Sequence, residues 1–253
     1  MSNLTLTQTA VTAQRLDMSA FTPQGLEGRS AIEIARIRIH VGNRSEEAGE
    51  LFNIRGTSGE RLSIVPAAGN LDNLGAGMQR GELRIEGDAG RGAARRLAGG
   101  SVSIAGTSGD EAGAGMSNGR LIIGGDAGER LGGPQIGETR GMSGGLIQVL
   151  GNAGDCCAAN MIAGTLAVLG QAGKMTGTGM RRGTLLLARP PISLPSTFND
   201  NGTHHLGFLP LLLAKLAELT DLPTPFATQS TLVHRFVGDL GEGGLGEILL
   251  PIE

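Results

Sequence analysis

Residues 81–90 read GELRIEGDAG, and this stretch recurs along the chain with its glycines and apolar residues in the same places. Four further copies follow: GSVSIAGTSG at 100–109, GRLIIGGDAG at 119–128, GLIQVLGNAG at 145–154 and GTLAVLGQAG at 164–173. A poorer copy, ERLSIVPAAG, lies at 60–69, and a shortened one, GTLLLAR, begins at residue 183. From residue 81 onward the starts lie 19, 19, 26, 19 and 19 residues apart, so this is a repeat protein.

Each copy contains two apolar residues separated by one other residue, and in the five complete copies a glycine lies two residues after the second of them. Alternation over so short a stretch predicts a strand with one buried face that ends at a glycine turn. A second apolar position recurs later in each repeat, and its flexible side chains are suited to filling gaps in a core. The residues at that position are Met78, Leu97, Met116, Met142, Met161 and Met180.

A unit of 19 residues cannot bury its own apolar face, whereas stacked units share one core. We therefore expect an all-β fold, a parallel β-helix of about seven coils, taken as right-handed. In such a stack Ile64, Ile85, Ile104 and Ile123 lie above one another. Antiparallel hairpins and leucine-rich repeats fit less well, because one strand-turn unit repeats in one direction and a second leucine-rich segment is missing.

Three regions are expected. Residues 1–58 form N-terminal strands that cap the stack, residues 59–189 form the glycine-rich β-helix, and residues 190–253 form an extension that caps it or docks a partner. Alternating apolar residues at 31–34 (AIEI) and 36–41 (RIRIHV) predict one or two strands. Residues 211–219, which follow Pro210, predict a short amphipathic helix.

One repeat is longer than its neighbours. The copy that begins at Gly119 contains seven extra residues, and the excess falls between Gly128 and Gly141. Because Met142 resumes the pattern, the extra residues are expected to leave the stack as a loop at one corner. Such a loop either contributes contacts to a partner or is a neutral insertion.

Composition narrows the function classes. The chain has 253 residues with 44 Gly, 6 Phe and no Trp or Tyr, and its formal net charge is −3. Nothing in this charge or in the scarce aromatic residues favours nucleic-acid binding. Residues 1–14 lack the features of a signal peptide, and the apolar run at 206–219 is too short to span a bilayer. We expect a cytoplasmic protein that binds neither nucleic acid nor membrane.

The search for chemistry yields no catalytic, cofactor-binding or metal-binding residue. Asp88 and Asp126 occupy turn positions where aspartate commonly bonds the local backbone. The four histidines lack a metal-ligand spacing, and the adjacent Cys156 and Cys157 fit free thiols in a reducing compartment. Arginines gather at the corners of the repeats, where they are either solvated charges or contacts for an acidic carrier or partner. The candidate contact residues are Arg91, Arg95, Arg96, Arg181 and Arg182.

The repeated G-x-φ-x-φ-x-G-x-x-G motif, in which φ is apolar, is followed by a G-M-x-x-G motif such as Gly115–Gly119. Over residues 60–189 this pattern resembles the glycine-rich β-helix found in the C subunit family of formylmethanofuran dehydrogenase. It is most similar to the bacterial branch, the C subunit of the formyltransferase/hydrolase complex of methylotrophs. The fold also resembles the β-helical C-terminal domain of the glutamate synthase large subunit.

The resemblance implies a scaffold subunit without a cofactor of its own. In such complexes a formyltransferase subunit and a zinc-dependent, amidohydrolase-like subunit hold the reacting sites, beside a degenerate dehydrogenase-like subunit. Together they pass a formyl group from a tetrahydromethanopterin derivative to a methanofuran-like carrier and release formate. The alternatives are the C subunit of a true formylmethanofuran dehydrogenase and, in another class, a β-helical carbohydrate-active enzyme. The latter normally needs clustered carboxylates and aromatic sugar platforms, and the chain lacks Trp and Tyr.

Overall fold

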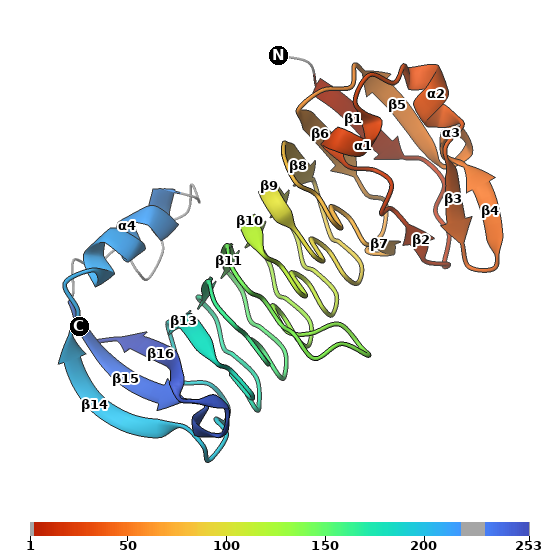
Figure 1. Cartoon of the computed structure of the whole chain (residues 1–253). Coiled ribbons are helices and arrows are strands. Elements are labelled where there is room, and N and C mark those ends of the chain that lie inside the picture. The colour runs from red at the N-terminus through yellow and green to blue at the C-terminus, as the bar shows by residue number, and fades with distance from the viewer. Residues whose placement is uncertain (1–2, 219–230, 253) are drawn as a thin grey trace.

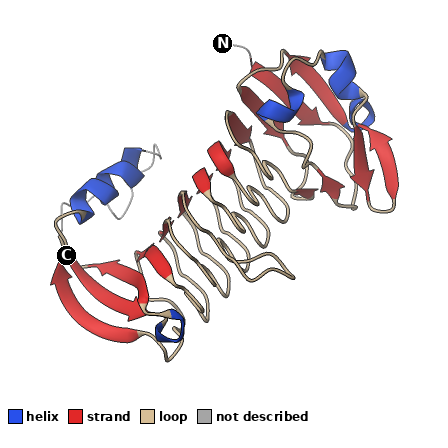
Figure 2. Ribbon diagram, in the orientation of Figure 1, coloured by secondary structure: helices blue, strands red, loops and turns tan. Residues whose placement is uncertain are grey.

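The computed structural model describes residues 3–218 and 231–252 and is built mainly of strands. The repeats lie side by side along one long axis, with the N-terminal strands at one end and the C-terminal strands at the other (Figure 1). Each repeat contributes a short strand, and most of its remaining length is turns and loops (Figure 2). Among the described residues, no helix is long and apolar enough to cross a bilayer.

The strands of the repeats pair in parallel, each with the strand of the next repeat. In their register Ile64, Ile85, Ile104 and Ile123 face one another in succession, so the predicted column of isoleucines is confirmed. All four side chains are buried. The strands are β6 (Arg61–Val65), β8 (Glu82–Ile85), β9 (Ala98–Ile104), β10 (Asn118–Ile123), β11 (Leu146–Val149), β12 (Thr165–Val168) and β13 (Arg182–Leu187).

The second predicted column is also buried, because Met78, Leu97, Met116, Met142, Met161 and Met180 are fully inaccessible to solvent. A third line of contacts joins the turns, in which Ala89, Ser108, Ala127, Ala153 and Ala172 form successive parallel bridges. Three separate columns therefore join the repeats that begin at residues 81 to 164, around a core without a Trp or Tyr side chain.

Aspartates at the turns act between repeats. Asp88 Oδ1 accepts a hydrogen bond from the backbone N–H of Thr107 at 2.7 Å, and Asp126 Oδ1 accepts one from Asn152 N–H at 2.7 Å. The sequence suggests a bond to the aspartate's own turn; the observed partner is the following repeat. Glycine is needed beside these carboxylates: a Cβ on Gly106 would overlap the Asp88 carboxylate and lie 2.9 Å from the Gly87 carbonyl carbon.

The insertion leaves the stack where the sequence places it. The N–H of Met142 donates to the carbonyl of Gly132 at 2.7 Å, which closes the base of a loop formed by residues 133–141. In Figure 1 this loop projects beyond the turns of the neighbouring repeats. Within the loop, the N–H of Glu138 donates to the carbonyl of Gln135 at 2.9 Å, so the tip is a closed turn.

The N-terminal region continues the same sheet. Its first strand pairs in parallel with β6, so Leu4 and Leu6 lie beside Leu62 and Ile64, and it also pairs antiparallel with a strand at the sheet edge. Short strands and single-turn helices complete the region. The elements are β1 (Asn3–Gln8), β2 (Leu16–Asp17), α1 (Pro23–Leu26), α2 (Ala31–Ala35), β3 (Arg38–Val41), β4 (Arg44–Glu47), α3 (Ala48–Leu51), β5 (Phe52–Gly56) and β7 (Leu71–Asp72).

One predicted strand is wrong. Residues 31–34 form most of α2, whereas residues 38–41 form β3 as expected. The Ser30 side chain accepts a hydrogen bond from Glu33 N–H at 3.3 Å, and Glu33 Oε2 accepts one from Ser30 N–H at 2.8 Å. This reciprocal capping box fixes a helix start and overrides the short alternation of isoleucines that follows it.

The C-terminal region returns to the stack. Strand β16 (Leu245–Pro251) pairs in parallel with β13, β15 (Leu232–Gly238) pairs antiparallel with β16, and β14 (Asn199–His205) pairs antiparallel with β15. A 3₁₀ turn at Leu240–Glu242 precedes β16. Within residues 3–218 and 231–252, the large sheet therefore has twelve strands in the order β14-β15-β16-β13-β12-β11-β10-β9-β8-β6-β1-β5. A second sheet has the order β4-β3-β2-β7.

The predicted C-terminal helix is present as α4 (Leu209–Glu218), and Leu219 lies outside the described residues. Its buried face, Leu209, Leu213 and Leu216, forms an apolar cluster with sheet residues. Those residues include Ala167 on β12, Leu186 on β13 and Leu249 on β16. The helix thus covers the outer face of the sheet at its C-terminal end, and this contact forms a second core outside the stack.

Candidate docking site at the arginine corner

Glu111 is the centre of a charged corner formed by three successive repeats. Its side chain is 3 % exposed, and its Oε1 lies 2.8 Å from Arg91 Nη2 and 3.2 Å from Arg130 Nη2. Burial alone raises the pKa of Glu111, but the hydrogen bonds and positive charges of Arg91 and Arg130 outweigh it and hold that pKa below its ordinary value. Each arginine comes from a repeat on one side of Glu111, so the carboxylate joins all three.

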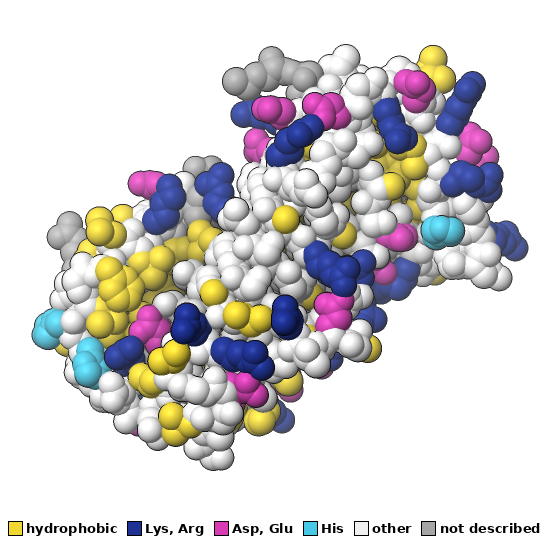
Figure 3. Space-filling view, viewed as in Figure 1, with side chains coloured by type: hydrophobic (Ala, Val, Ile, Leu, Met, Phe, Trp, Pro, Cys, Tyr) yellow, Lys and Arg dark blue, Asp and Glu magenta, His cyan; other side chains and the backbone are white. Residues whose placement is uncertain are grey.

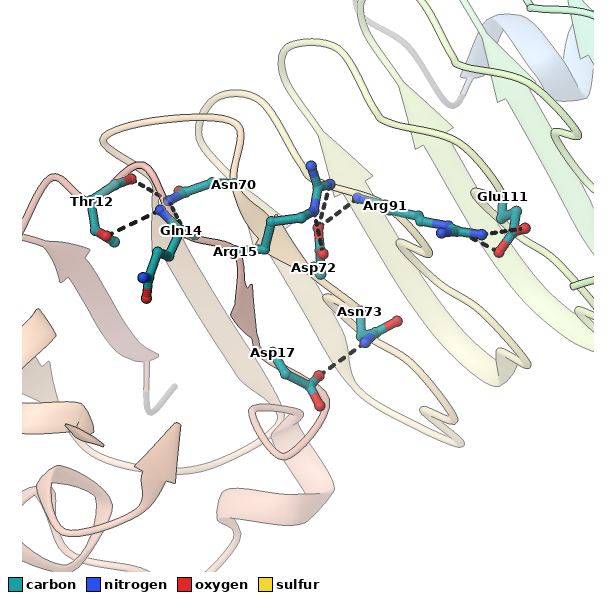
Figure 4. A network of polar contacts seen from close by, with 9 residues as sticks. All are labelled: Thr12, Gln14, Arg15, Asp17, Asn70, Asp72, Asn73, Arg91 and Glu111. Carbon is teal, nitrogen blue, oxygen red and sulfur yellow. Dashed lines mark hydrogen bonds and ion pairs between the residues drawn. The ribbon is translucent and has the colours of Figure 1, made fainter. Parts of the chain in front are cut away.

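The same network reaches the N-terminal region (Figure 4). Arg15 makes a two-pronged contact with Asp72, at 2.6 Å from Nε to Oδ2 and 2.7 Å from Nη2 to Oδ1. Asp72 Oδ1 also accepts a hydrogen bond from Arg91 N–H at 2.8 Å. Nearby, Asn73 donates to Asp17 at 3.0 Å. These contacts tie the segment before β2 to the first repeats.

A groove of about 400 Å³ opens beside this network, between the repeats and the inserted loop. Arg95 is half-buried in its wall, and no ion pair joins it to another described residue. Ile136, from the inserted loop, lines the groove and is 66 % exposed. The lining residues are Asp72, Asn73, Arg91, Gly92, Arg95, Glu111, Gln135 and Ile136.

A second groove of about 210 Å³ lies on the other side of the loop, toward the C-terminus. Arg181 pairs there with Glu242, from the 3₁₀ turn, at 2.9 Å. Arg140, from the loop itself, is exposed and has no ion pair with another described residue. The lining residues are Thr139, Arg140, Asn160, Ile162, Gly179, Arg181 and Glu242.

The five arginines singled out from the sequence do not form one patch. Arg91 and Arg95 line the first groove, and Arg96 pairs with Glu138 of the inserted loop. Arg181 lines the second groove, and Arg182 is exposed at the start of β13. On the face shown in Figure 3, basic and acidic side chains are interspersed and much of the repeat surface carries neither.

Sequence reasoning missed the polarity of the outward-facing column of the sheet. Its residues are polar in β6, β8 and β9, whereas those of β12, β13 and β16 are apolar and lie under α4. The outward residue lies between the two apolar residues of each repeat, so the trend was present in the sequence. The column consists of Ser63, Arg84, Ser103, Ile122, Gln148, Ala167, Leu186 and Leu249.

At the boundary of this change the side chain of Gln148 is buried, and neither its Oε1 nor its Nε2 has a hydrogen-bond partner among the described residues. Beyond it, a groove of about 370 Å³ crosses the open strands β8–β10 and is bordered by Arg84, Arg120 and Glu218. The sheet face is therefore covered near the C-terminus and open over the earlier repeats.

The remaining reactive side chains are dispersed. Among residues 3–218 and 231–252, no group of three or more His, Cys, Asp or Glu side chains has the arrangement of a metal site. Cys157 is buried, which raises the pKa of its thiol to about 12, and Cys156 is half-buried. His234 Nε2 lies 2.7 Å from Asp200 Oδ1, a contact between β15 and β14.

Comparison with known proteins agrees with this architecture. No family model matches the chain. A stretch of 78 residues is 34 % identical to the C subunit of the formyltransferase/hydrolase complex of Methylorubrum extorquens. The matched stretch makes up 31 % of this chain and 29 % of that relative. The fold matches a chain in the crystal structure of the formyltransferase/hydrolase complex of M. extorquens with methylofuran. That match has a TM-score of 0.81 and 32 % identity, and it covers 98 % of this chain and 100 % of the other. The chain therefore belongs to the C subunit family of the formyltransferase/hydrolase complex.

Proposed function

We propose that this chain is a non-catalytic scaffold subunit of a formyltransferase/hydrolase complex. The observation that carries the proposal is the match, over 98 % of the chain, to a structure of such a complex. Parallel columns of buried residues run through all the repeats and give a rigid rod of the kind that holds other proteins in place. Its partners are the formyltransferase, amidohydrolase-like and dehydrogenase-like subunits.

The reaction belongs to the assembly. Its subunits transfer a formyl group between a tetrahydromethanopterin derivative and a methanofuran-like carrier and release formate, in the one-carbon metabolism of the cytoplasm. Zinc lies in a partner subunit, and this chain binds no cofactor. Contacts to the carrier or to a partner come from the arginine corners, at Arg91, Arg95, Arg96, Arg181 and Arg182.

The architecture that serves this role is a right-handed parallel β-helix of about seven coils at residues 59–189. Parallel pairing of every repeat with the next supports it, and crossovers between parallel strands are almost always right-handed. Residues 1–58 cap one end, where β5 completes the sheet antiparallel to β1. Residues 190–253 cap the other end through β14–β16 and α4.

Co-purification from the native host tests the assembly. A tagged full chain is expected to retain the other subunits, identified by mass spectrometry, and the retained complex is expected to transfer the formyl group and release formate. The purified chain alone is expected to do neither. Formyl transfer by the chain alone contradicts the scaffold role, and a chain recovered without those subunits contradicts membership of the complex.

A further inference from the structure

The inserted loop separates two grooves, each of which is lined in part by arginines. Gln135 and Ile136 line the groove toward the N-terminus, and Thr139 and Arg140 line the groove toward the C-terminus. The loop is also anchored, because Glu138 pairs with Arg96 of an earlier repeat. A neutral insertion needs no such anchor; a loop that presents a binding surface benefits from one, since a fixed loop loses less conformational freedom on binding.

Each groove contains one arginine that forms no ion pair with another described residue. In the first, Arg15 is matched by Asp72, and Arg91 and Arg130 share Glu111. Asp110 adds a further negative charge near Arg15 and Arg91. Arg95 is left without a carboxylate among the described residues although its side chain is half-buried.

The second groove repeats this arrangement. Glu242 takes up Arg181, and Arg140 remains without an ion pair in the described part of the chain. Between Arg95 and Arg140, the closed turn at the tip of the loop exposes 66 % of Ile136. The surface thus presents a cation, an exposed apolar side chain and a second cation in sequence across the loop.

We propose that an extended acidic segment of a partner subunit lies across the inserted loop. Its carboxylates pair with Arg95 on one side and Arg140 on the other, and an apolar side chain contacts Ile136. Arg95 and Arg140 line different grooves, so one small anion within a groove meets one of them, whereas a chain that passes over the loop meets both. This inference rests on the proposed role within a multi-protein complex, and it assigns the loop as the place where a partner is held.

The test measures association of the full chain with the remaining subunits, co-expressed without it, at low and high salt. Arg95→Glu with Arg140→Glu is expected to slow association roughly ten-fold at low salt and to weaken its salt dependence, because charges at an interface rim act mainly on the association rate. Ile136→Ser is expected to speed dissociation a few-fold. The matched control is Arg44→Glu with Arg55→Glu, two exposed arginines of the N-terminal region that change the net charge equally.

An association rate unchanged by the first pair, or slowed equally by the control pair, overturns the docking assignment and leaves the scaffold role intact. Failure of the unaltered chain to associate overturns both. Each variant is checked by its thermal unfolding midpoint. Arg95→Gln with Arg140→Gln repeats the test without adding carboxylates beside Asp72 and Glu111. Its midpoint should stay near that of the unaltered chain, since neither Arg95 nor Arg140 takes part in an ion pair with a described residue.

Discussion

The repeats and the two ends of the molecule are held together by contacts of different range. In the middle, each strand pairs with a strand one repeat away, as Leu121 does with Val102. At the C-terminal end, β13 pairs with β16 although Leu185 and Ile248 lie far apart in sequence, and α4 packs on the outer face of the sheet. The repeats are therefore joined by a series of nearly equivalent contacts, whereas the two end regions are separate elements that pack onto the stack. A substitution that weakens the contact between two repeats should therefore destabilise all of the repeats, whereas a substitution in an end region should destabilise only that region.

The strongest test of the contacts between repeats is Leu121→Ala. Leu121 is fully buried in the middle of the stack, and truncation is expected to lower the free energy of unfolding by about 4 kcal/mol through lost burial and a cavity. Its neighbour Ile122 points to the opposite face and is half-buried, so Ile122→Ala should cost about 1 kcal/mol. Urea unfolding measures both values. Equal losses from the two substitutions contradict a one-sided core.

A second test adds atoms where repeats approach most closely. Gly106→Ala places a methyl group against Gly87 and the Asp88 carboxylate, and we expect a loss of about 3 kcal/mol. The control is Gly137→Ala in the inserted loop, where no atom lies within 4 Å of a new Cβ and only the positive φ of 86° opposes the change. That substitution should cost about 1 kcal/mol. A harmless Gly106→Ala would mean that the repeats can separate without loss.

The docked end is tested by Leu213→Ala on α4. Leu213 is 1 % exposed against the sheet, and its truncation should weaken the packing of the helix by about 2 kcal/mol. Hydrogen exchange is expected to quicken in α4 and to stay unchanged in β9 and β10. Leu211→Ala, on the face of the helix where Leu211 is 76 % exposed, serves as the control and should alter neither. Faster exchange throughout the repeats contradicts the view of α4 as a separately docked piece.

The smallest expected effect is that of Glu111→Gln, about 1 kcal/mol at pH 7, because both arginine partners are partly exposed and screened. The pKa of Glu111 is lowered in the folded chain, so its ionised form contributes stability above the ordinary glutamate pKa of about 4.3. That contribution is lost as pH falls through the lowered pKa. Unfolding measured from pH 7 to about pH 3 should therefore bring the variant and the unaltered chain together. If the difference in stability between the variant and the unaltered chain persists in acid, the effect comes from the shape of the side chain and not from its charge.

The repeats were predictable because their partners recur at a fixed distance in the sequence. A buried column requires the same residue type at the same place in every repeat, as Met116 and Met142 show on either side of the insertion. The two strands that extend the parallel pairing of the repeats, β1 and β16, were not predicted. Leu4 and Leu6 lack flanking glycines, and the segment 246–250 (GEILL) follows the template but stands far from the other copies.

The charged corner was predictable only in part. The positions of Arg91, Arg95 and Arg96 indicated a basic corner, but pairing depends on how long side chains cross between repeats and on the path of the loop. Nothing periodic relates Arg96 to Glu138, and Glu111 finds partners in two different repeats. The helix at 31–35 was missed for a different reason. Its capping residues, Ser30 and Glu33, can be recognised in the sequence, but the alternation of isoleucines was given more weight than the capping box.

The closure between Gly132 and Met142 lets the chain leave the stack and rejoin it without disturbing the strands on either side. The position of such a loop along the stack is fixed by the number of strands that precede it. Moving the seven extra residues into the neighbouring repeat would shift the loop by one strand spacing, roughly 4.8 Å, and leave the rest of the molecule in register. The loop can therefore be placed at different heights along the stack in discrete steps, to suit partners of different size. Only the repeat that carries the loop changes, while the composition of the chain stays the same.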